Sequence, residues 1–329
     1  MVKIAMMMRT VLLACAVAAF SANVHAQAQS FPSRPVRVLV PFGPGSGADI
    51  VTRFVADGLG AQLKQPVLVE NRDGAGGILG AQTVLRAPAD GYTVMGIPGP
   101  TYLIAPQLSK TLPFDPIRDF VAVAKVGYVP MILVTSAQSQ YKTMKDLIND
   151  MKANPGKVSF ATSGKGAQGH LEAEYISRFF GLSGIDIPYK SSATSVADTV
   201  SNTVAFYITG YGSVASNIAA GRLRALAVGA PARLPVIPDV PTFIEATGIP
   251  NYIPTSWFGF VVRSGTPTDI VEKLEDAIMR TAGNPVVREK IQGTGSYMSV
   301  LSGKEFGAEM AAENEKLAKL INALNLKND

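Results

Sequence analysis

A glycine-rich segment from Pro41 to Asp49 is the first place in the sequence where residue types and spacing suggest ligand chemistry. It reads Pro-Phe-Gly-Pro-Gly-Ser-Gly-Ala-Asp and follows a short apolar run, Val36 to Val40. Glycines let the backbone approach a ligand closely, and a helix starting near residue 48 would present unpaired N–H groups with a partial positive charge. Together these features predict an anion site that needs no charged side chain.

Asp49 has a different expected role in this segment. An acid in the first turn of a helix is usually a partner of the helix dipole. This is the favoured interpretation of Asp49. A further role is to cap N–H groups of the loop and so hold the loop's shape, whereas direct contact with an anion is poorly supported.

A second loop of the same kind runs from Thr162 to Gly169, between a predicted strand at 158–161 and a helix that reaches Phe180. Open α/β sheets bind ligands at the carboxyl ends of their strands, where both loops lie. We therefore expect the two loops to line one cleft. For either loop alone, a plain strand-to-helix turn is the alternative.

The first loop also matches a dinucleotide-binding fingerprint. Gly43-x-Gly45-x-x-Ala48 follows a strand and opens a helix, and Glu70 ends the next predicted strand, where a ribose-binding acid would lie. The prolines make this turn stiffer than the turn of a dinucleotide-binding loop. In addition, the N-terminal segment described below indicates export, and an exported chain meets little free NAD. A dinucleotide-dependent oxidoreductase is therefore only a minor alternative.

Hydrolytic and metal chemistry are poorly supported. The sequence has two histidines and one cysteine, and of these only His170 lies beyond the first 26 residues. A serine nucleophile needs a histidine base, and no Gly-x-Ser-x-Gly elbow is present. Metal sites need clusters of histidine, cysteine or carboxylate. We expect no enzyme activity, no cofactor and no metal.

The first 26 residues have the pattern of a secretory signal peptide. Lys3 and Arg9 precede an apolar run, and Val24-His25-Ala26 fits a small-x-small cleavage site. The run is shorter than the ~20 residues needed to cross a bilayer, which argues against a membrane anchor. We expect cleavage after Ala26, with lipidation at Cys15 as the alternative.

Cleavage after Ala26 would leave a chain without cysteine. Its formal charge would fall from +5 to +3, because two basic residues and no acid are lost. Such a chain must be stable through its core alone, and its length suffices for that. This net charge is small and the sequence contains no Lys/Arg block, so nucleic acid is not an expected partner. We expect a soluble, monomeric protein of the periplasm.

The elements that position the two loops fall into two similar groups. Strands are predicted at 36–40, 67–69 and 92–95 with helices between them, an order that indicates a parallel sheet flanked by helices. A second group has strands at 158–161 and 223–228. Capping patterns predict helix starts at Thr143–Asp146, Thr266–Asp269 and Ser302–Glu305, and Trp257 with Phe258 is expected to pack in the interior.

The same segments, in the same order, resemble the Bug, or TctC-like, solute-binding receptors of tripartite tricarboxylate transporters. The resemblance spans the whole mature chain and rests on an ordered set of short motifs. They are Pro41 to Asp49, Asn71-Arg72 with Gly74 to Gly77, Asp90-Gly91-Tyr92-Thr93, Pro113 to Pro116 with Asp119-Phe120, Asn154 to Lys157, Ser163-Gly164-x-Gly166 with His170-Leu171, Pro188-Tyr189-Lys190, Leu223 to Val228, Pro238 to Thr242 and Gly265-Thr266-Pro267.

The resemblance implies a type II-like periplasmic-binding-protein fold. Two α/β lobes, each a mostly parallel sheet flanked by helices, would close on a ligand in the cleft between them. Lobe 1 is expected to comprise residues 27–127 and 257–329, and lobe 2 residues 128–256. The implied function is capture of a small organic carboxylate and its delivery to membrane transporter subunits, with a two-component sensor kinase as the alternative partner.

The resemblance also implies which residues contact the ligand, with Ser163 as a direct donor. Three positions depart from the family pattern: Ser46 and Ser191-Ser192 replace glycines, and Thr209 stands where an aspartate frequently ends the strand. Loss of that acid predicts a plain mono- or dicarboxylate, aromatic ones included, rather than an amino acid. The expected ligand-binding residues are Phe42, Gly43, Gly45, Ser46, Gly47, Ala48, Asp49, Gly77, Tyr102, Thr162, Ser163, Gly166, Ala167, Gln168, Tyr189 and Thr209.

Overall fold

The structure is a computed structural model that describes residues 31–74, 77–108, 114–162, 167–189 and 192–323. Residues from Pro35 onward form one unit, distinct from the segment that precedes it. The predicted signal peptide and two predicted ligand contacts, Ser163 and Gly166, lie outside the described residues. In the described part, no helix has the length and apolar character needed to cross a membrane.

The first group of predicted strands forms a parallel sheet, as expected. β1 (Val36–Val40) lies between β2 (Val67–Asn71) and β3 (Thr93–Pro98) and is parallel to both. α2 (Gly47–Leu63) connects β1 to β2, and α3 (Ile78–Arg86) connects β2 to β3. The valines and the leucine of β1 are completely buried, which explains its continuous apolar run.

The second group is built in the same way. β5 (Ser159–Thr162) lies between β6 (Ile185–Pro188) and β7 (Phe206–Gly210) and is parallel to both. α5 (Met144–Ala153) precedes β5, and its predicted capping box between Thr143 and Asp146 is confirmed. α6 (Gln168–Phe180) and α7 (Ser192–Val200) follow β5 and β6.

Two long strands, which the sequence analysis did not predict, join the two groups into one sheet. β4 (Phe120–Ser136) is antiparallel to β9 (Thr255–Arg263) and β10 (Tyr297–Ser302) along its first part. Along its second part it pairs with β7 and with β8 (Leu223–Val228). The main path of the sheet is β2-β1-β3-β9-β4-β7-β5-β6.

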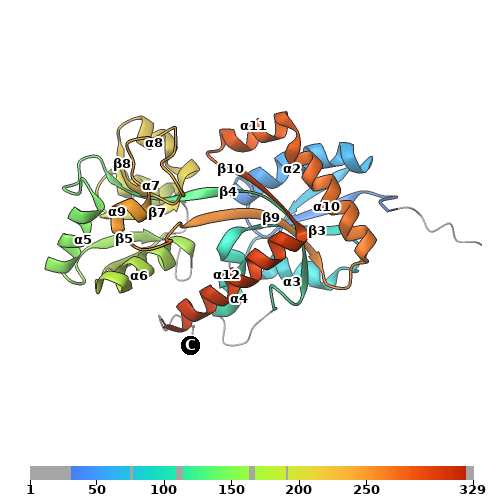
Figure 1. The fold of residues 1–329 in the computed structure, drawn as a ribbon, viewed down its shortest axis with the longest axis horizontal. Helices are drawn as coiled ribbons and strands as arrows, with labels where there is room; N and C mark the ends of the chain where they lie inside the picture. Colours follow the sequence, from blue (N-terminus) through green and yellow to red (C-terminus); the bar gives the residue numbers. More distant parts are fainter. Residues whose placement is uncertain (1–30, 75–76, 109–113, 163–166, 190–191, 324–329) are drawn as a thin grey trace, which may run out of the picture. The chain divides into compact units, whose positions relative to one another are not determined.

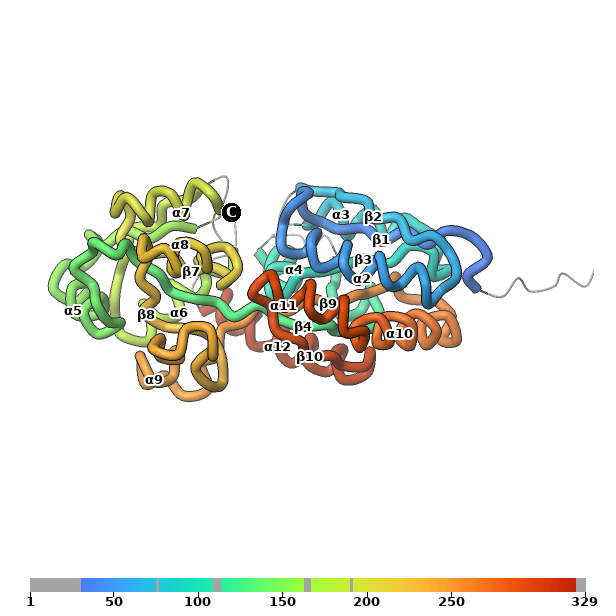
Figure 2. The backbone as a smooth tube through the Cα atoms, turned by 90° about the horizontal axis from the view of Figure 1, so that it is seen from above, coloured from blue at the N-terminus to red at the C-terminus, as the bar shows by residue number. Residues whose placement is uncertain are grey.

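The shared strands make the sheet mixed at its centre and parallel toward its two ends. β4 passes from the half that holds α2 and α10 to the half that holds α5 and α7 (Figures 1 and 2). The predicted lobe boundaries, near residues 127 and 257, fall inside β4 and β9. Those boundaries stay a prediction, because both halves share these two strands.

The other helices complete the two halves, and two of their starts test the capping predictions. The box at the start of α12 is confirmed, because Ser302 Oγ accepts from Glu305 N at 3.3 Å and Glu305 accepts from Ser302 N at 3.0 Å. The prediction at Thr266 is wrong by one residue, since Pro267 is the N-cap and Thr266 donates to the Arg263 carbonyl instead. The remaining helices of the two halves are α4 (Gly99–Leu108), the short 3-10 helix η2 (Tyr211–Ser213), α8 (Ala215–Ala219), α9 (Phe243–Thr247), α10 (Thr268–Gly283), α11 (Pro285–Gly293) and α12 (Gly303–Ala323).

Each half has its own apolar core. Trp257 belongs to the core of the first half and packs edge-on against Phe306 of α12, with ring centroids 5.0 Å apart. Trp257 and Phe258 are 2% and 7% exposed, which confirms that they serve in packing. A small separate cluster brings together Ile104 of α4, Leu171 of α6 and Ile321 of α12.

Candidate functional site

The first glycine-rich loop is held in shape by the Asp49 carboxylate. One oxygen, Oδ2, accepts from the backbone N–H of Gly45 at 2.9 Å. The other, Oδ1, accepts from Asn71 Nδ2 at 2.8 Å and from Arg53 Nε at 3.0 Å. The same Asn71 nitrogen donates to the Phe42 carbonyl at 2.9 Å. The hydrogen bond from Gly45 confirms the further role of Asp49, which is to cap the N–H groups of the loop.

These hydrogen bonds keep Asp49 ionised in a buried position. Burial opposes the charged form, and it is the largest single influence on this carboxyl. The hydrogen bonds from Arg53, the Gly45 N–H and Asn71, with the charge of Arg53, together outweigh it and hold the pKa of Asp49 below its usual range. Asp49 is thus fully engaged with hydrogen-bond partners of the protein itself.

The start of α2 keeps donors available beyond those that the protein uses. Ser46 is the N-cap, and its Oγ accepts from Asp49 N at 3.2 Å. Within the described residues, the backbone N–H groups of Gly47 and Ala48 have no hydrogen-bond partner. Gly45 has φ +80°, a conformation that favours glycine, and a Cβ there would meet nothing within 4 Å. The loop therefore offers backbone donors at a helix N-terminus, as the sequence predicted.

The N-terminus of α3 supports the first loop from the side. Gly77, its N-cap, has φ +96°, and a Cβ placed there would lie 3.4 Å from Phe42 Cζ. A Cβ on Gly43 would lie 3.5 Å from Asp73 Oδ2. Gly77 is thus brought together with the first loop, but through packing against the Phe42 ring.

The described part of the second loop is anchored to the end of β6. The Thr162 hydroxyl donates to Asp186 Oδ1 at 2.5 Å, and its carbonyl accepts from Tyr189 N at 2.8 Å. The Tyr189 hydroxyl donates to Asp198 Oδ2 at 2.7 Å. Burial, followed by this hydrogen bond, raises the pKa of Tyr189 to about 12. Its hydroxyl proton is therefore committed to Asp198.

Three helix N-termini meet on one short stretch of β9, from Thr255 to Phe258. At the start of α2, a Cβ on Gly47 would lie 3.6 Å from Phe258 Cζ. At the start of α4, a Cβ on Gly99 would lie 2.7 Å from Ser256 Oγ. At the start of α6, Gln168 Nε2 donates to the Thr255 carbonyl at 2.8 Å.

This stretch of β9 contacts the helices that follow both loops. Thr255 and Phe258 are three residues apart, which corresponds to roughly 10 Å along a strand. The starts of α2 and α6 are therefore both held by the same short piece of β9.

Two predicted contacts are buried, and their contact with a ligand stays a prediction. Tyr102 is 4% exposed, its ring packs with Phe114 and Phe120, and its hydroxyl donates to the Pro116 carbonyl at 3.3 Å. Its apolar surroundings in α4 give it a core role. Thr209 lies in β7, is 8% exposed and is paired with Ile132 of β4.

Sequence reasoning missed several residues that build the site. Asn71 was noted only as part of a motif, although it clamps both Asp49 and Phe42. Its position at the end of β2, next to the end of β1, was the available signal. The role of Ser256 and Thr255 depends on how β9 crosses the sheet, and no local pattern indicates that crossing.

Known proteins of one family match nearly the whole chain. The family model described as "Tripartite tricarboxylate transporter family receptor" matches residues 51–326. Protein BugT of Bordetella pertussis is 33% identical over 301 residues, which are 91% of this chain and 92% of BugT. The solved periplasmic binding protein BugD has a TM-score of 0.78 and 28% identity, with 91% of this chain and 100% of BugD covered.

Two further solved structures carry small acids. An R. palustris protein determined with adipate has a TM-score of 0.79 and 29% identity, with 90% of this chain and 98% of that chain covered. MatC from Rhodopseudomonas palustris, with bound malate, has a TM-score of 0.77 and 26% identity, with 88% and 100% covered. The fold is that of the two-lobed periplasmic binding proteins, and the family is one of receptors rather than enzymes. The chain belongs to the TctC family, the receptors of tripartite tricarboxylate transporters.

Proposed function

We propose that this protein captures a small organic carboxylate between the two glycine-rich loops and delivers it to a tripartite tricarboxylate transporter. The observation that carries the proposal is the meeting of the α2, α4 and α6 N-termini on Thr255–Phe258. Each N-terminus carries a partial positive charge, and three helix starts in contact with one short stretch of strand favour a negative ligand near it.

The donors that would hold the ligand are neutral. At the first loop they are the N–H groups of Gly47 and Ala48 with the Ser46 hydroxyl, and at the second loop Ser163 and the backbone up to Gln168. Neutral donors satisfy a carboxylate without the desolvation cost of a buried ion pair. Phe42, Gly43, Gly45, Gly77, Thr162, Gly166, Ala167, Tyr189 and Thr209 complete the proposed set as shaping or lining residues.

The proposed ligand class is a mono- or dicarboxylate. The relatives solved with adipate and malate both hold dicarboxylates. Thr209 offers a hydroxyl where an acid would favour a ligand amine, so the proposal excludes amino acids such as aspartate and glutamate.

Export and domain closure complete the proposed cycle. The segment up to Ala26 would direct the chain to the periplasm and be removed there. Closure of residues 128–256 against residues 27–127 and 257–329 would bury the ligand and create the surface that the membrane subunits recognise.

Native mass spectrometry of the purified protein, followed by thermal-shift measurements with a panel of carboxylates, tests this proposal. We expect a bound mass that leaves on mild denaturation, and a rise in Tm with at least one mono- or dicarboxylate. A rise with aspartate or glutamate that exceeds the rise with all plain acids would contradict the ligand class. A rise with NAD and with no carboxylate would contradict the proposal as a whole.

A further inference from the structure

A pocket of mixed polar and apolar lining lies behind the start of α6, where α6 and the C-terminal helix α12 face each other. Its volume is about 650 Å³, part of which is open solvent, and it is lined by residues of α4, α6, α12 and the segment 251–255. The apolar cluster of Ile104, Leu171 and Ile321 borders it, and Arg178 of α6 donates to the Ala323 carbonyl at 2.6 Å. α12 therefore joins the core of the first half, through Phe306, to a helix of the second half.

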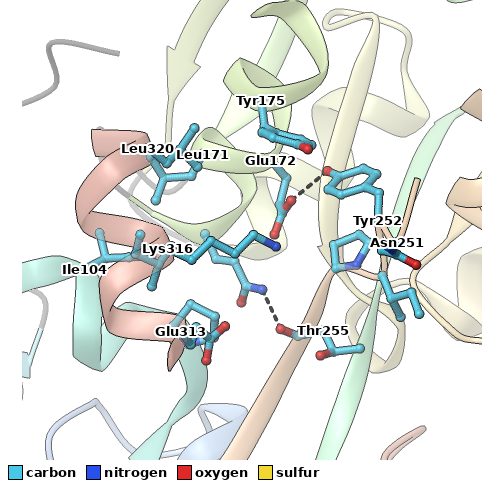
Figure 3. Close-up of a pocket in the computed structure, with 15 residues that line it drawn as sticks. Ile104, Leu171, Glu172, Tyr175, Asn251, Tyr252, Thr255, Glu313, Lys316 and Leu320 are labelled. Carbon is cyan, nitrogen blue, oxygen red and sulfur yellow. Dashed lines mark hydrogen bonds between the residues drawn. The ribbon is translucent and has the colours of Figure 1, made fainter. Parts of the chain in front are cut away.

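Glu172 of α6 is the central polar group of this pocket (Figure 3). Its Oε2 accepts from the Tyr252 hydroxyl at 2.6 Å. Gln168, one turn earlier on α6, also lines the pocket, and its Nε2 donates to the Thr255 carbonyl. Glu172 is thus one helical turn from the contact that anchors the start of α6 to β9.

α12 presents charges of both signs to Glu172. Lys316 extends from α12 toward Glu172 (Figure 3), and in the described residues no ion pair within 4 Å joins it to a carboxylate of the pocket. Glu313, one turn earlier, accepts from Trp257 Nε1 at 2.5 Å. Tyr175 of α6 is a further titratable group that lines the pocket, and its ring lies 4.9 Å from that of Tyr252. Two carboxylates therefore face one ammonium, and full ionisation leaves an excess negative charge between the two helices.

We propose that Glu172 is a proton-linked positioning residue, which holds the start of α6 against α12 and β9 when it carries a proton and loosens that contact when it is ionised. Protonation converts the carboxylate and a solvent proton into a neutral acid, and it leaves one net charge fewer between α6 and α12. Because Glu172 and Gln168 lie one turn apart on α6, and Gln168 anchors that helix to β9, the arrangement in which the helix N-termini meet on β9 then depends on pH.

The sign of this dependence follows from the environment of Glu172. Burial, opposed by the hydrogen bond from Tyr252 and by the charge of Lys316 and aided by the charge of Glu313, raises the pKa of Glu172 to about 7 in this arrangement. In a loosened, hydrated arrangement the pKa returns to its ordinary value near 4.3. The packed arrangement is therefore favoured fully below the ordinary pKa, and this preference is lost as the pH rises through about 7.

Trp257, the single tryptophan of the chain, allows a test that needs no ligand. Its indole N–H donates to Glu313, which faces Glu172 across the pocket. We expect tryptophan emission of the full-length mature protein to change in a step near pH 7, and we expect Glu172→Gln to abolish the step. Glu174→Gln, a matched change on the same helix outside the pocket lining, should leave the step unchanged.

Lys316→Met provides a second variant should Glu172→Gln not fold. Lys316 is exposed, so its replacement is compatible with folding. Removing the ammonium disfavours ionised Glu172, and the step should move to higher pH. The inference is overturned if wild type shows no step near pH 7. It is also overturned if the step survives in Glu172→Gln, as it would if His170 or Glu313 carried it, or if Lys316→Met leaves it in place.

A second measurement, which rests on the proposed carboxylate-binding function, links Glu172 to the ligand. Affinity for a carboxylate chosen from the panel should weaken about ten-fold between pH 6 and pH 8 in wild type, as expected for one linked proton. In Glu172→Gln the affinity should stay high and constant. Failure of every carboxylate to bind would refute the proposed function while the fluorescence step still tests the proton link. Binding that is equally pH-dependent in wild type and Glu172→Gln would refute the link alone.

Discussion

Asn71 and Asp49, 22 residues apart in the chain, are joined by a 2.8 Å hydrogen bond from the amide nitrogen to Oδ1. The same nitrogen also donates to the carbonyl of Phe42. The conformation of the first loop is therefore fixed by a side chain at the end of the neighbouring strand β2, and not by its glycines alone.

Replacement of Asn71 by alanine should loosen the loop. The variant leaves a partly buried carboxylate and a carbonyl each short of a donor, which costs about 1–3 kcal/mol of stability. Calorimetric titration with a bound carboxylate should show weaker affinity, and thermal unfolding a lower Tm. Asn154→Ala is the control, since Asn154 donates to Asp150 at 2.7 Å in α5. It should lower Tm and leave affinity unchanged; equal losses of affinity would refute the special role of Asn71.

Gly45→Ala should weaken ligand binding more than a comparable glycine replacement elsewhere. Its φ of +80° strains an alanine by about 1 kcal/mol, and the loop relieves that strain by reorienting its N–H groups. Gly248, with φ +72° and open space around it, is the matched control at the end of α9. Both variants should unfold at similarly reduced temperatures. Retention of full affinity by Gly45→Ala would show that the loop backbone does not hold the ligand.

Gly99→Ala should destabilise the protein and displace the start of α4. The added Cβ would lie 2.8 Å from Trp257 N and 2.7 Å from Ser256 Oγ, and the backbone contact cannot yield without moving a strand. Overpacking of this kind costs about 1–3 kcal/mol. Gly283→Ala, in α10 with nothing within 4 Å, should be neutral or stabilising in the same urea titration. A stable Gly99→Ala variant with wild-type affinity would separate α4 from the site.

Acid should destabilise the fold through Asp119 and Asp49. The hydrogen bond from Arg118, partly opposed by burial, lowers the pKa of Asp119, and Asp49 is lowered by its own network. Carboxyls with a lowered pKa stabilise the folded state above the ordinary unfolded value near 4, and this contribution is lost as the pH falls through the folded pKa. Thermal melts between pH 7 and pH 3 should show Tm falling most steeply below about pH 4. Asp119→Asn should lower Tm at pH 7 and flatten the acid limb, and an unchanged slope would exclude Asp119 as a contributor.

The parallel parts of the fold follow directly from the sequence. The run from Val36 to Val40 is apolar at nearly every position because both faces of β1 are covered, and the capping boxes at Thr143 and Ser302 mark helix starts by local hydrogen bonds alone. The first loop was also predictable, because its glycines and Asp49 interact within one helical turn.

The joining strands and the shared part of the site were not predictable in this way. β4 pairs with different strands along its two parts and carries bulges, so its apolar pattern has no single period. The packing of Tyr102 against Phe114 and Phe120 was not predictable either, because it depends on tertiary contacts and not on a local pattern. The anchoring of Gln168 to Thr255 joins residues 87 positions apart, and only the tertiary fold sets that contact.

The sheet narrows where its two halves join. Among the described residues, Val129 and Pro130 of β4 are paired only with Ser256 and Thr255 of β9. The pairing of β4 with β10 ends at Tyr128, and its pairing with β7 starts at Met131. Two hydrogen-bonded strands resist stretching and sliding, but such ribbons twist more readily than wide sheets. We therefore expect the protein to twist at this narrow part of the sheet. One half would then rotate against the other while both ligand loops keep their contacts with β9.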